Sequence, residues 1–74
     1  MPPEDDGRIR CRLTELLADR NMTLTELAAR VDISLVNLSV LKNNRARAIR
    51  FSTLTAICDA LACEVGELLV VAPD

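Results

Sequence analysis

The chain has 74 residues, a formal net charge of −2 and an apolar fraction of 50%, so it has room for one small domain and is too apolar to stay disordered. It contains no histidine, which removes the usual general base near neutral pH and all histidine-containing zinc sites. Its longest apolar run, residues 68–72, is far too short to cross a bilayer.

The N-terminal part of the chain contains a tail, an ambiguous segment and a helix. Residues 1–7 hold two prolines, three acids and a glycine, and we expect a disordered acidic tail. The apolar positions of residues 8–12 alternate as in a strand but also fit one face of a helix. A helix is predicted from about 13 to 20, with Asn21 as its left-handed cap. If residues 8–12 are extended, their natural partner is the β-prone run 68–72.

Two short helices follow, each opened by residues that satisfy the free amides of a helix start. Thr23 and Glu26 have the spacing of a capping box, which predicts a helix over about 24–31. Ser34 is the next N-cap and predicts a second helix over about 35–42. Two capped helices separated by three or four residues are typical of a helix-turn-helix motif.

The remaining residues predict two more helices. Ser52 is the expected N-cap of a fourth helix, and a short fifth helix is expected over about 64–69. Residues 8–72 are therefore expected to form a single all-α domain. The inner face of the fourth helix has apolar residues at helical spacing, namely Leu54, Ile57, Cys58 and Leu61.

The cysteines indicate a reducing compartment. Cys11, Cys58 and Cys63 are odd in number, show no C-x-x-C spacing and follow no secretory signal. We expect a cytoplasmic protein in which all three thiols pack as small apolar side chains. The sequence predicts neither a bound metal nor a cofactor.

The charges are distributed unevenly along the chain. Residues 33–58 carry four basic side chains and no acidic one, whereas the segments on both sides are net acidic. A cluster of this kind is either a solvated loop or a face that meets phosphates. Its coincidence with the second motif helix and the loop that follows favours phosphate contact. The four residues are Lys42, Arg45, Arg47 and Arg50.

The spacing of the matching residues carries a family resemblance. Residues 22–69 resemble the short stand-alone members of the Cro/CI-type (Xre-like) helix-turn-helix regulators. The resemblance implies a compact five-helix lambda-repressor-like domain, bacterial transcription regulation and a homodimer on a two-fold site in double-stranded DNA. The run 68–71, paired with 9–11, is our candidate dimer interface. The matching residues are Thr23, Glu26, Leu27, Ala28, Ile33, Ser34, Leu38, Ser39 and Leu41, followed by matches within 50–54, 57–61 and 66–68.

The resemblance also assigns the DNA-binding residues. It makes 34–42 the recognition helix in the major groove and places the basic loop 42–50 on phosphates. The chain departs from the family by carrying Asp32 in the turn, where Gly is usual, and apolar residues at positions that often read bases. The predicted DNA-binding residues are Ser34, Leu35, Val36, Asn37, Ser39, Val40, Lys42, Asn43, Arg45, Arg47 and Arg50.

Parts of the sequence also match two other functions. The apolar residues on helix 34–42 also suit a helical protein-interaction module, such as an antitoxin-like partner subunit. Ser39 and Lys42 match the S-x-x-K string of some serine enzymes, but no oxyanion site or supporting residues accompany them. We therefore do not expect an enzyme.

Overall fold

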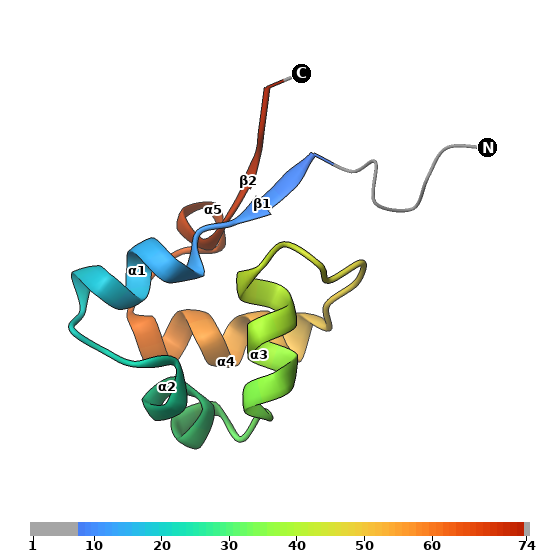
Figure 1. The fold of residues 1–74 in the computed structure, drawn as a ribbon. Helices are drawn as coiled ribbons and strands as arrows, with labels where there is room; N and C mark the ends of the chain where they lie inside the picture. The colour runs from blue at the N-terminus through green and yellow to red at the C-terminus, as the bar shows by residue number, and fades with distance from the viewer. Residues whose placement is uncertain (1–7, 74) are drawn as a thin grey trace.

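The computed structural model describes residues 8–73, which form five helices and one two-stranded antiparallel sheet (Figure 1). The expected tail, residues 1–7, lies outside the described residues. The fold is mostly helical, as predicted, and residues 9–11 adopt the strand rather than the helix alternative. The elements are β1 (Ile9–Cys11), α1 (Leu13–Asp19), α2 (Leu24–Val31), α3 (Leu35–Lys42), α4 (Phe51–Leu61), α5 (Val65–Leu68) and β2 (Leu69–Val71).

The sheet joins the two ends of the described chain. β1 and β2 pair antiparallel, with Arg10 opposite Val70 (Figure 1). Just past the strands, the Arg12 amide donates to the Leu68 carbonyl over 2.7 Å. This pairing ties the start of α1 to the end of α5, so the two ends of the described chain lie in the same ribbon.

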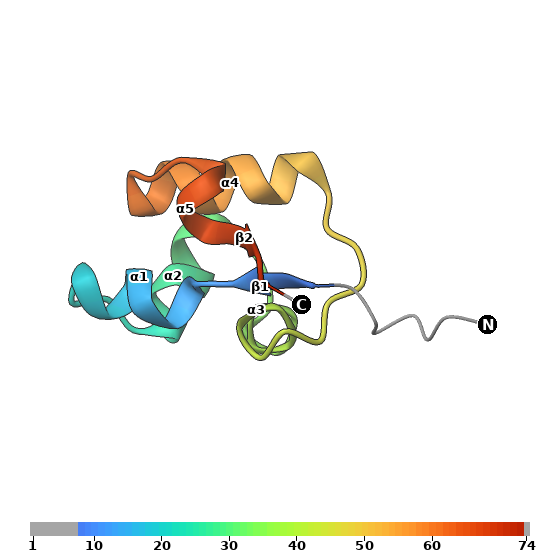
Figure 2. The ribbon, with the colours of Figure 1, turned by 90° about the horizontal axis from the view of Figure 1, so that it is seen from above.

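The core lies between α4 and the other helices. α2 packs on both α3 and α4, α1 contacts α3, and α5 contacts α4. Seen from above, α4 lies on one side of the domain and α3, viewed nearly end-on, on the other (Figure 2). The outer face of α3 therefore points away from the core. The largest fully buried side chains are Leu13, Leu27, Leu38, Ile57, Leu61 and Leu68.

The predicted caps of α2 and α3 are confirmed. The Glu26 amide donates to Thr23 Oγ1 over 3.0 Å, and the Thr23 amide donates to Glu26 Oε1 over 2.8 Å. The Asn37 amide donates to Ser34 Oγ over 3.0 Å. Asp32, between the two helices, has the left-handed conformation expected of it, with φ of 56°. Local hydrogen bonds thus set the start of each motif helix.

The predicted start of α4 is wrong. The helix begins at Phe51, one residue before the expected cap Ser52, and its N-cap is Arg50. Arg50 has an extended backbone and makes no side-chain capping bond. Ser52 consequently lies inside the first turn, where its hydroxyl cannot act as an N-cap.

The fifth helix is shorter than the predicted 64–69. It spans Val65–Leu68, and Glu64 is its N-cap in a second capping box with Glu67. Leu69 adopts φ of −122° and ψ of 130°, because it already belongs to β2. Pairing with β1 therefore ends the helix.

The three cysteines are free and belong to the hydrophobic core or lie against it. Cys58 is buried, and Cys11 and Cys63 are half-buried against the core, which confirms the predicted packing role. Burial, followed by the neighbouring Cys63, raises the pKa of the Cys58 thiol to about 11. Burial also raises the pKa of Cys11. At neutral pH these two side chains are therefore thiols rather than thiolates.

The capping box of α2 should make the free energy of unfolding depend on pH under acidic conditions. Hydrogen bonds from the Thr23 amide, then from the Thr23 side chain, hold the pKa of the Glu26 carboxyl below its usual range. A carboxyl whose pKa is lower in the folded state stabilises the fold above its unfolded pKa, and this contribution disappears as the pH falls through the folded pKa. We expect Glu26→Gln to flatten the acid side of the stability-against-pH curve, measured by urea unfolding.

A matched pair of variants isolates the cap. Thr23→Ala removes the N-cap and should lower the free energy of unfolding by about 1 kcal/mol near neutral pH. Thr25→Ala removes an exposed hydroxyl within the same helix and should cost almost nothing. Equal losses in the two variants would show that the Thr23 cap does not stabilise α2.

Candidate nucleic-acid interface

α3 has a buried side and an exposed side of different chemistry. Leu38 and Leu41 point into the core, and Leu38 is only 1% exposed. Val36 is 71% exposed, and Val40 lies one turn further along the same side. Leu35, at the start of the helix, is also exposed. The outer side of α3 therefore offers apolar contacts at its centre.

Polar side chains lie at both ends of that exposed side. Ser34 accepts the Asn37 amide, which leaves the hydroxyl proton of Ser34 free to donate outward. At the other end, Asn43 Nδ2 donates to Ser39 Oγ over 3.4 Å. Ser39 is half-buried, whereas Asn37 and Asn43 are exposed. The helix thus presents hydrogen-bonding groups on either side of its apolar centre.

The loop after α3 returns beside the helix and forms one wall of an open groove. Asn37 and Val40 line the groove from α3, and Ala46 and Ile49 line it from the loop. The loop connects α3 to the start of α4 at the edge of the domain (Figure 1). Thr53 of α4 completes this wall. The groove is therefore lined jointly by the outer side of α3 and by the loop that follows it.

The groove is mainly basic. Arg45, Arg47 and Arg50 line it and are all exposed, whereas Lys42 is half-buried on α3. Asp32 also lines it, so one acid from the turn between α2 and α3 lies among the arginines. The charge of residues 33–58 does not include this acid, because it lies one residue outside that segment. The groove nevertheless combines three cations with one anion.

The first turn of α4 adds free backbone donors. No side chain caps the helix, since Arg50 makes no capping bond. The first amides of a helix have no partner within it and favour anions. They begin directly after Arg50, next to the groove that Thr53 lines. The corrected start of α4 therefore places amide donors beside the arginines. Phe51, in the same turn, is 85% exposed.

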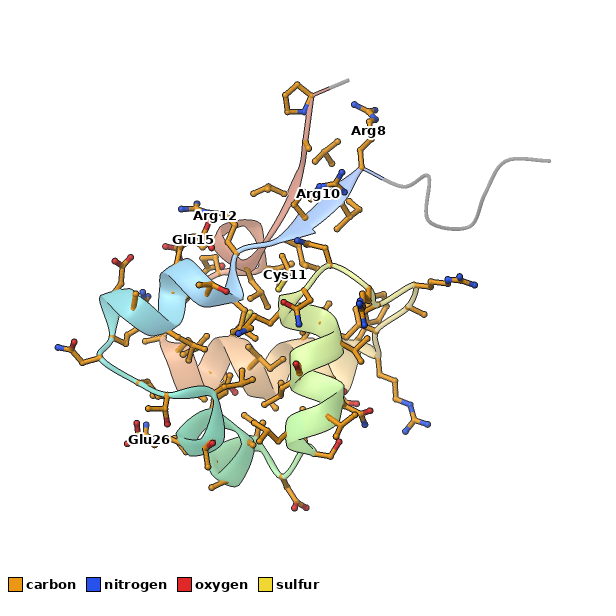
Figure 3. The ribbon with its side chains drawn as sticks, in the orientation of Figure 1. Arg8, Arg10, Cys11, Arg12, Glu15 and Glu26 are labelled. Carbon is orange, nitrogen blue, oxygen red and sulfur yellow. The ribbon has the colours of Figure 1, made fainter. Side chains whose placement is uncertain are left out.

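β1 and the residue before it bring basic side chains that are not among the predicted DNA-binding residues. The Cys11 amide donates to Asn44 Oδ1 over 2.7 Å, which holds the strand against the residues that follow α3. Figure 3 shows Arg10 on this strand and Arg8 just before it, at the opposite end of the domain from Glu26. Asn44 makes this bond from a left-handed conformation with φ of 62°. The alternation of basic and apolar residues over 8–13 was the available signal.

The predicted DNA-binding residues fall into two sets. Ser34, Asn37, Val40, Arg45, Arg47 and Arg50 line the groove, whereas Leu35, Val36, Ser39, Lys42 and Asn43 do not. All lie on α3, at its N-cap or in the loop up to the N-cap of α4. None is buried, and only Ser39 and Lys42 are half-buried. Their contact with DNA stays a prediction. What the structure brings together is an exposed helix side, a basic loop and an uncapped helix start.

Two other kinds of site find no counterpart in the described chain. Within residues 8–73, no group of three or more His, Cys, Asp or Glu side chains is arranged to hold a metal ion. No helix in the same range is long and apolar enough to span a membrane.

Comparison with known proteins gives consistent relatives. The sequence profile of the Cro/C1-type HTH DNA-binding domain matches residues 12–74. The chain is 57% identical over 54 residues to YozG of Bacillus subtilis (strain 168), an uncharacterized HTH-type transcriptional regulator. That match covers 73% of this chain but only 64% of the length of the relative. The crystal structure of the transcriptional regulator VanUg is similar with a TM-score of 0.75 and 31% identity, covering 92% of this chain and 91% of that one.

Proposed function

Because the chain belongs to the family of Cro/C1-type helix-turn-helix DNA-binding domains, we propose that it is a small transcriptional regulator that binds specific sequences in double-stranded DNA. The family is one of DNA-binding domains and not of enzymes. We further propose that residues 8–72 act as a single lambda-repressor-like domain in the bacterial cytoplasm, where it binds DNA as a homodimer.

One observation carries this proposal. Arginines on the loop after α3 line the same groove as the exposed side of α3, namely Arg45, Arg47 and Arg50. An α-helix fits the major groove of B-DNA, and cations beside it then meet the phosphate backbone. In this arrangement α3 is the recognition helix. The amides at the start of α4 bind a phosphate next to Arg50.

The base contacts would be mainly apolar. Val36 and Val40 sit at the centre of the exposed side, where they suit thymine methyl groups. Asn37 has the amide that pairs with adenine in the major groove. Ser34 and Asn43 lie at the two ends of α3, within reach of phosphates or base edges. We therefore propose an operator with A·T pairs opposite the middle of α3.

The first experiment measures binding to DNA of arbitrary sequence. Fluorescence anisotropy with a labelled 20-base-pair duplex at about 50 mM salt should show a dissociation constant in the micromolar range, as expected of non-specific contacts. Selection of bound sequences from a random library should then yield two-fold symmetric sites. No binding at tens of micromolar protein would contradict the proposal.

The outer side of α3 also suits the alternative function, which is binding to another protein. Val36 and Leu35 are apolar and exposed, which a protein-interaction module such as an antitoxin-like subunit would use. Substituting Val36→Glu separates the two functions. A DNA-reading helix loses affinity for DNA through repulsion from phosphates. If Val36→Glu left DNA binding unchanged, the exposed side of α3 would not face DNA.

A further inference from the structure

The turn that ends α4 brings two cysteines together. Ala62 follows the helix in a left-handed conformation with φ of 52°. The Cys63 amide donates to the Cys58 carbonyl over 3.0 Å, and the Ala62 amide donates to the Asp59 carbonyl over 3.3 Å. These two bonds are those of a Schellman motif, which places the residue after the left-handed one beside a residue of the last helical turn. At this helix end both of those residues are cysteines.

The two thiols contact each other but differ in their access to solvent. The Cys63 thiol lies within hydrogen-bonding contact of the Cys58 thiol. Cys58 is buried, whereas Cys63 is half-buried on the turn. The end of α1 has the same backbone bond, from the Met22 amide to the Leu17 carbonyl over 3.0 Å, with two apolar side chains in place of the thiols. Apolar residues therefore suffice for packing at such a turn, and a pair of thiols adds the capacity to form a disulfide.

The difference in burial sets the order in which the two thiols react. Burial, followed by the neighbouring Cys63, raises the pKa of the Cys58 thiol, and it is the thiolate that attacks a disulfide. Cys58 is therefore protected from oxidants in solution, whereas the half-buried Cys63 is open to a small one. Once Cys63 is in a mixed disulfide, its thiol no longer raises the pKa of Cys58. Cys58 then lies beside the sulfur that it must attack.

The charges around the pair favour a cationic reactant. Asp59 and Glu64 are exposed and close enough to the buried thiol to contribute to its raised pKa. Arg20 is a cation at the same turn, and its guanidinium donates to two carbonyls at the end of α4 over 2.6 and 3.5 Å. Two carboxylates and one guanidinium leave the turn net negative. A negative surface raises the local concentration of cations and lowers that of anions.

We propose that Cys58 and Cys63 form a dithiol site that small cationic disulfides oxidise to an intramolecular disulfide, with Cys63 attacking first and Cys58 resolving the product. The Cys63 thiolate attacks one sulfur of the small disulfide, breaks its S–S bond and releases one small thiol. The Cys58 sulfur then attacks the Cys63 sulfur, breaks the mixed disulfide and releases the second small thiol. Two electrons pass from the cysteine pair to the small disulfide, and the two protons of the pair end on the released thiols.

The site is independent of the proposed DNA binding. Arg50 precedes the first residue of α4, and Cys63 lies beyond the last one, so the two sites lie at opposite ends of this helix (Figure 1). Oxidation would link the end of α4 to the residue that precedes Glu64, the N-cap of α5. The cross-link would therefore fix the joint between α4 and α5 and leave the groove unchanged.

Reaction of the folded full chain with cystamine, a cationic disulfide, tests the site. Residues 51–74 contain neither lysine nor arginine, so trypsin releases Cys58 and Cys63 in one peptide and separates them from Cys11. Mass spectrometry of this peptide should show a loss of about 2 Da relative to the reduced peptide, because two hydrogens leave and no adduct remains. A stable cysteamine adduct on the unmodified chain, or a disulfide that includes Cys11, would overturn the proposal.

Two variants separate the roles of the thiols, and circular dichroism checks that both are folded. Cys58→Ala removes the resolving thiol, so the peptide should keep one cysteamine adduct of about 75 Da. Cys63→Ala removes the attacking thiol, and the peptide should stay unmodified because Cys58 is buried. An adduct on Cys63→Ala, or none on Cys58→Ala, would contradict the order of reaction.

Two further measurements test the contributions of charge and of the fold. Cystamine should react with Cys58→Ala roughly fivefold faster than anionic glutathione disulfide does, after both rates are divided by those for N-acetylcysteine. In mixtures of cystamine and cysteamine, the folded unmodified chain should favour the intramolecular disulfide roughly 10-fold more than the chain in urea does. An equal rate for the two disulfides would contradict the cationic preference. An equal equilibrium in urea would show that the turn does not bring the thiols together.

Discussion

Replacing Arg45, Arg47 and Arg50 together by glutamine is expected to weaken binding to duplex DNA roughly 500-fold for each bound protomer at 0.1 M salt. All three are exposed and line the groove beside α3. Each phosphate contact contributes about 0.9 to the slope of the logarithm of the association constant against the logarithm of salt concentration. At 0.1 M salt each contact therefore contributes about 0.9 logarithmic units of affinity, and the variant loses three contacts. Glutamine keeps most of the side-chain volume, so the variant should fold normally. Anisotropy titrations against a random-sequence duplex measure the loss.

Single substitutions show whether the effect belongs to position or to net charge. Arg50→Gln and Arg30→Gln change the net charge equally, but Arg30 lies in the last turn of α2 and does not line the groove. For each bound protomer, Arg50→Gln should weaken binding by roughly eightfold and reduce the salt slope by about 0.9, whereas Arg30→Gln should leave the slope unchanged. Equal effects at the two positions would mean that the groove is not the phosphate-binding region.

Leu38→Ala is expected to lower the free energy of unfolding by about 3 kcal/mol. Leu38 is 1% exposed and points into the core from α3, which packs on α2 and contacts α1. Truncating a buried leucine removes its apolar burial and leaves a cavity, which together cost roughly 3–5 kcal/mol. A domain of this length has a total stability of roughly 4–11 kcal/mol, so the variant should be close to unfolding. Urea unfolding followed by circular dichroism measures the change.

The same helix provides the control. Val36→Ala removes apolar side-chain atoms on the exposed side of α3, where no packing is lost. Its stability should change by less than about 0.5 kcal/mol. Both measurements need one protein concentration, because the proposed dimer would contribute to apparent stability. A Leu38→Ala variant as stable as Val36→Ala would contradict the packing of α3 on the core.

The local features of the fold were predictable from the sequence. Thr23 and Ser34 reveal the starts of α2 and α3, because a capping side chain bonds to an amide only three residues away. Asp32 and Asn21 mark the ends of helices for a similarly local reason, since both residue types enter the left-handed region more readily than most. The family resemblance rests on these elements and on the apolar residues between them.

Other features were not predictable from local sequence patterns. Ser52 has the chemistry of an N-cap, but the backbone of Arg50 sets where α4 begins. The hydrogen bond from Cys11 to Asn44 joins residues 33 positions apart, and no local pattern in either segment predicts it. The place of Asp32 in the groove also depends on how the loop after α3 folds back. The sequence left strand and helix open for residues 8–12 and named the run 68–72 as the partner of a strand. The choice of the strand for residues 9–11 depends on that long-range pairing, because β2 supplies the partner.

The dependence of DNA affinity on salt tests the central claim most directly. If the exposed side of α3 enters the major groove and Lys42, Arg45, Arg47 and Arg50 meet phosphates, the logarithm of the association constant should fall with the logarithm of salt concentration. The predicted slope is about −3.5 for each protomer, from four contacts at about 0.9 each. A slope near zero for the unmodified chain would contradict phosphate binding by this surface.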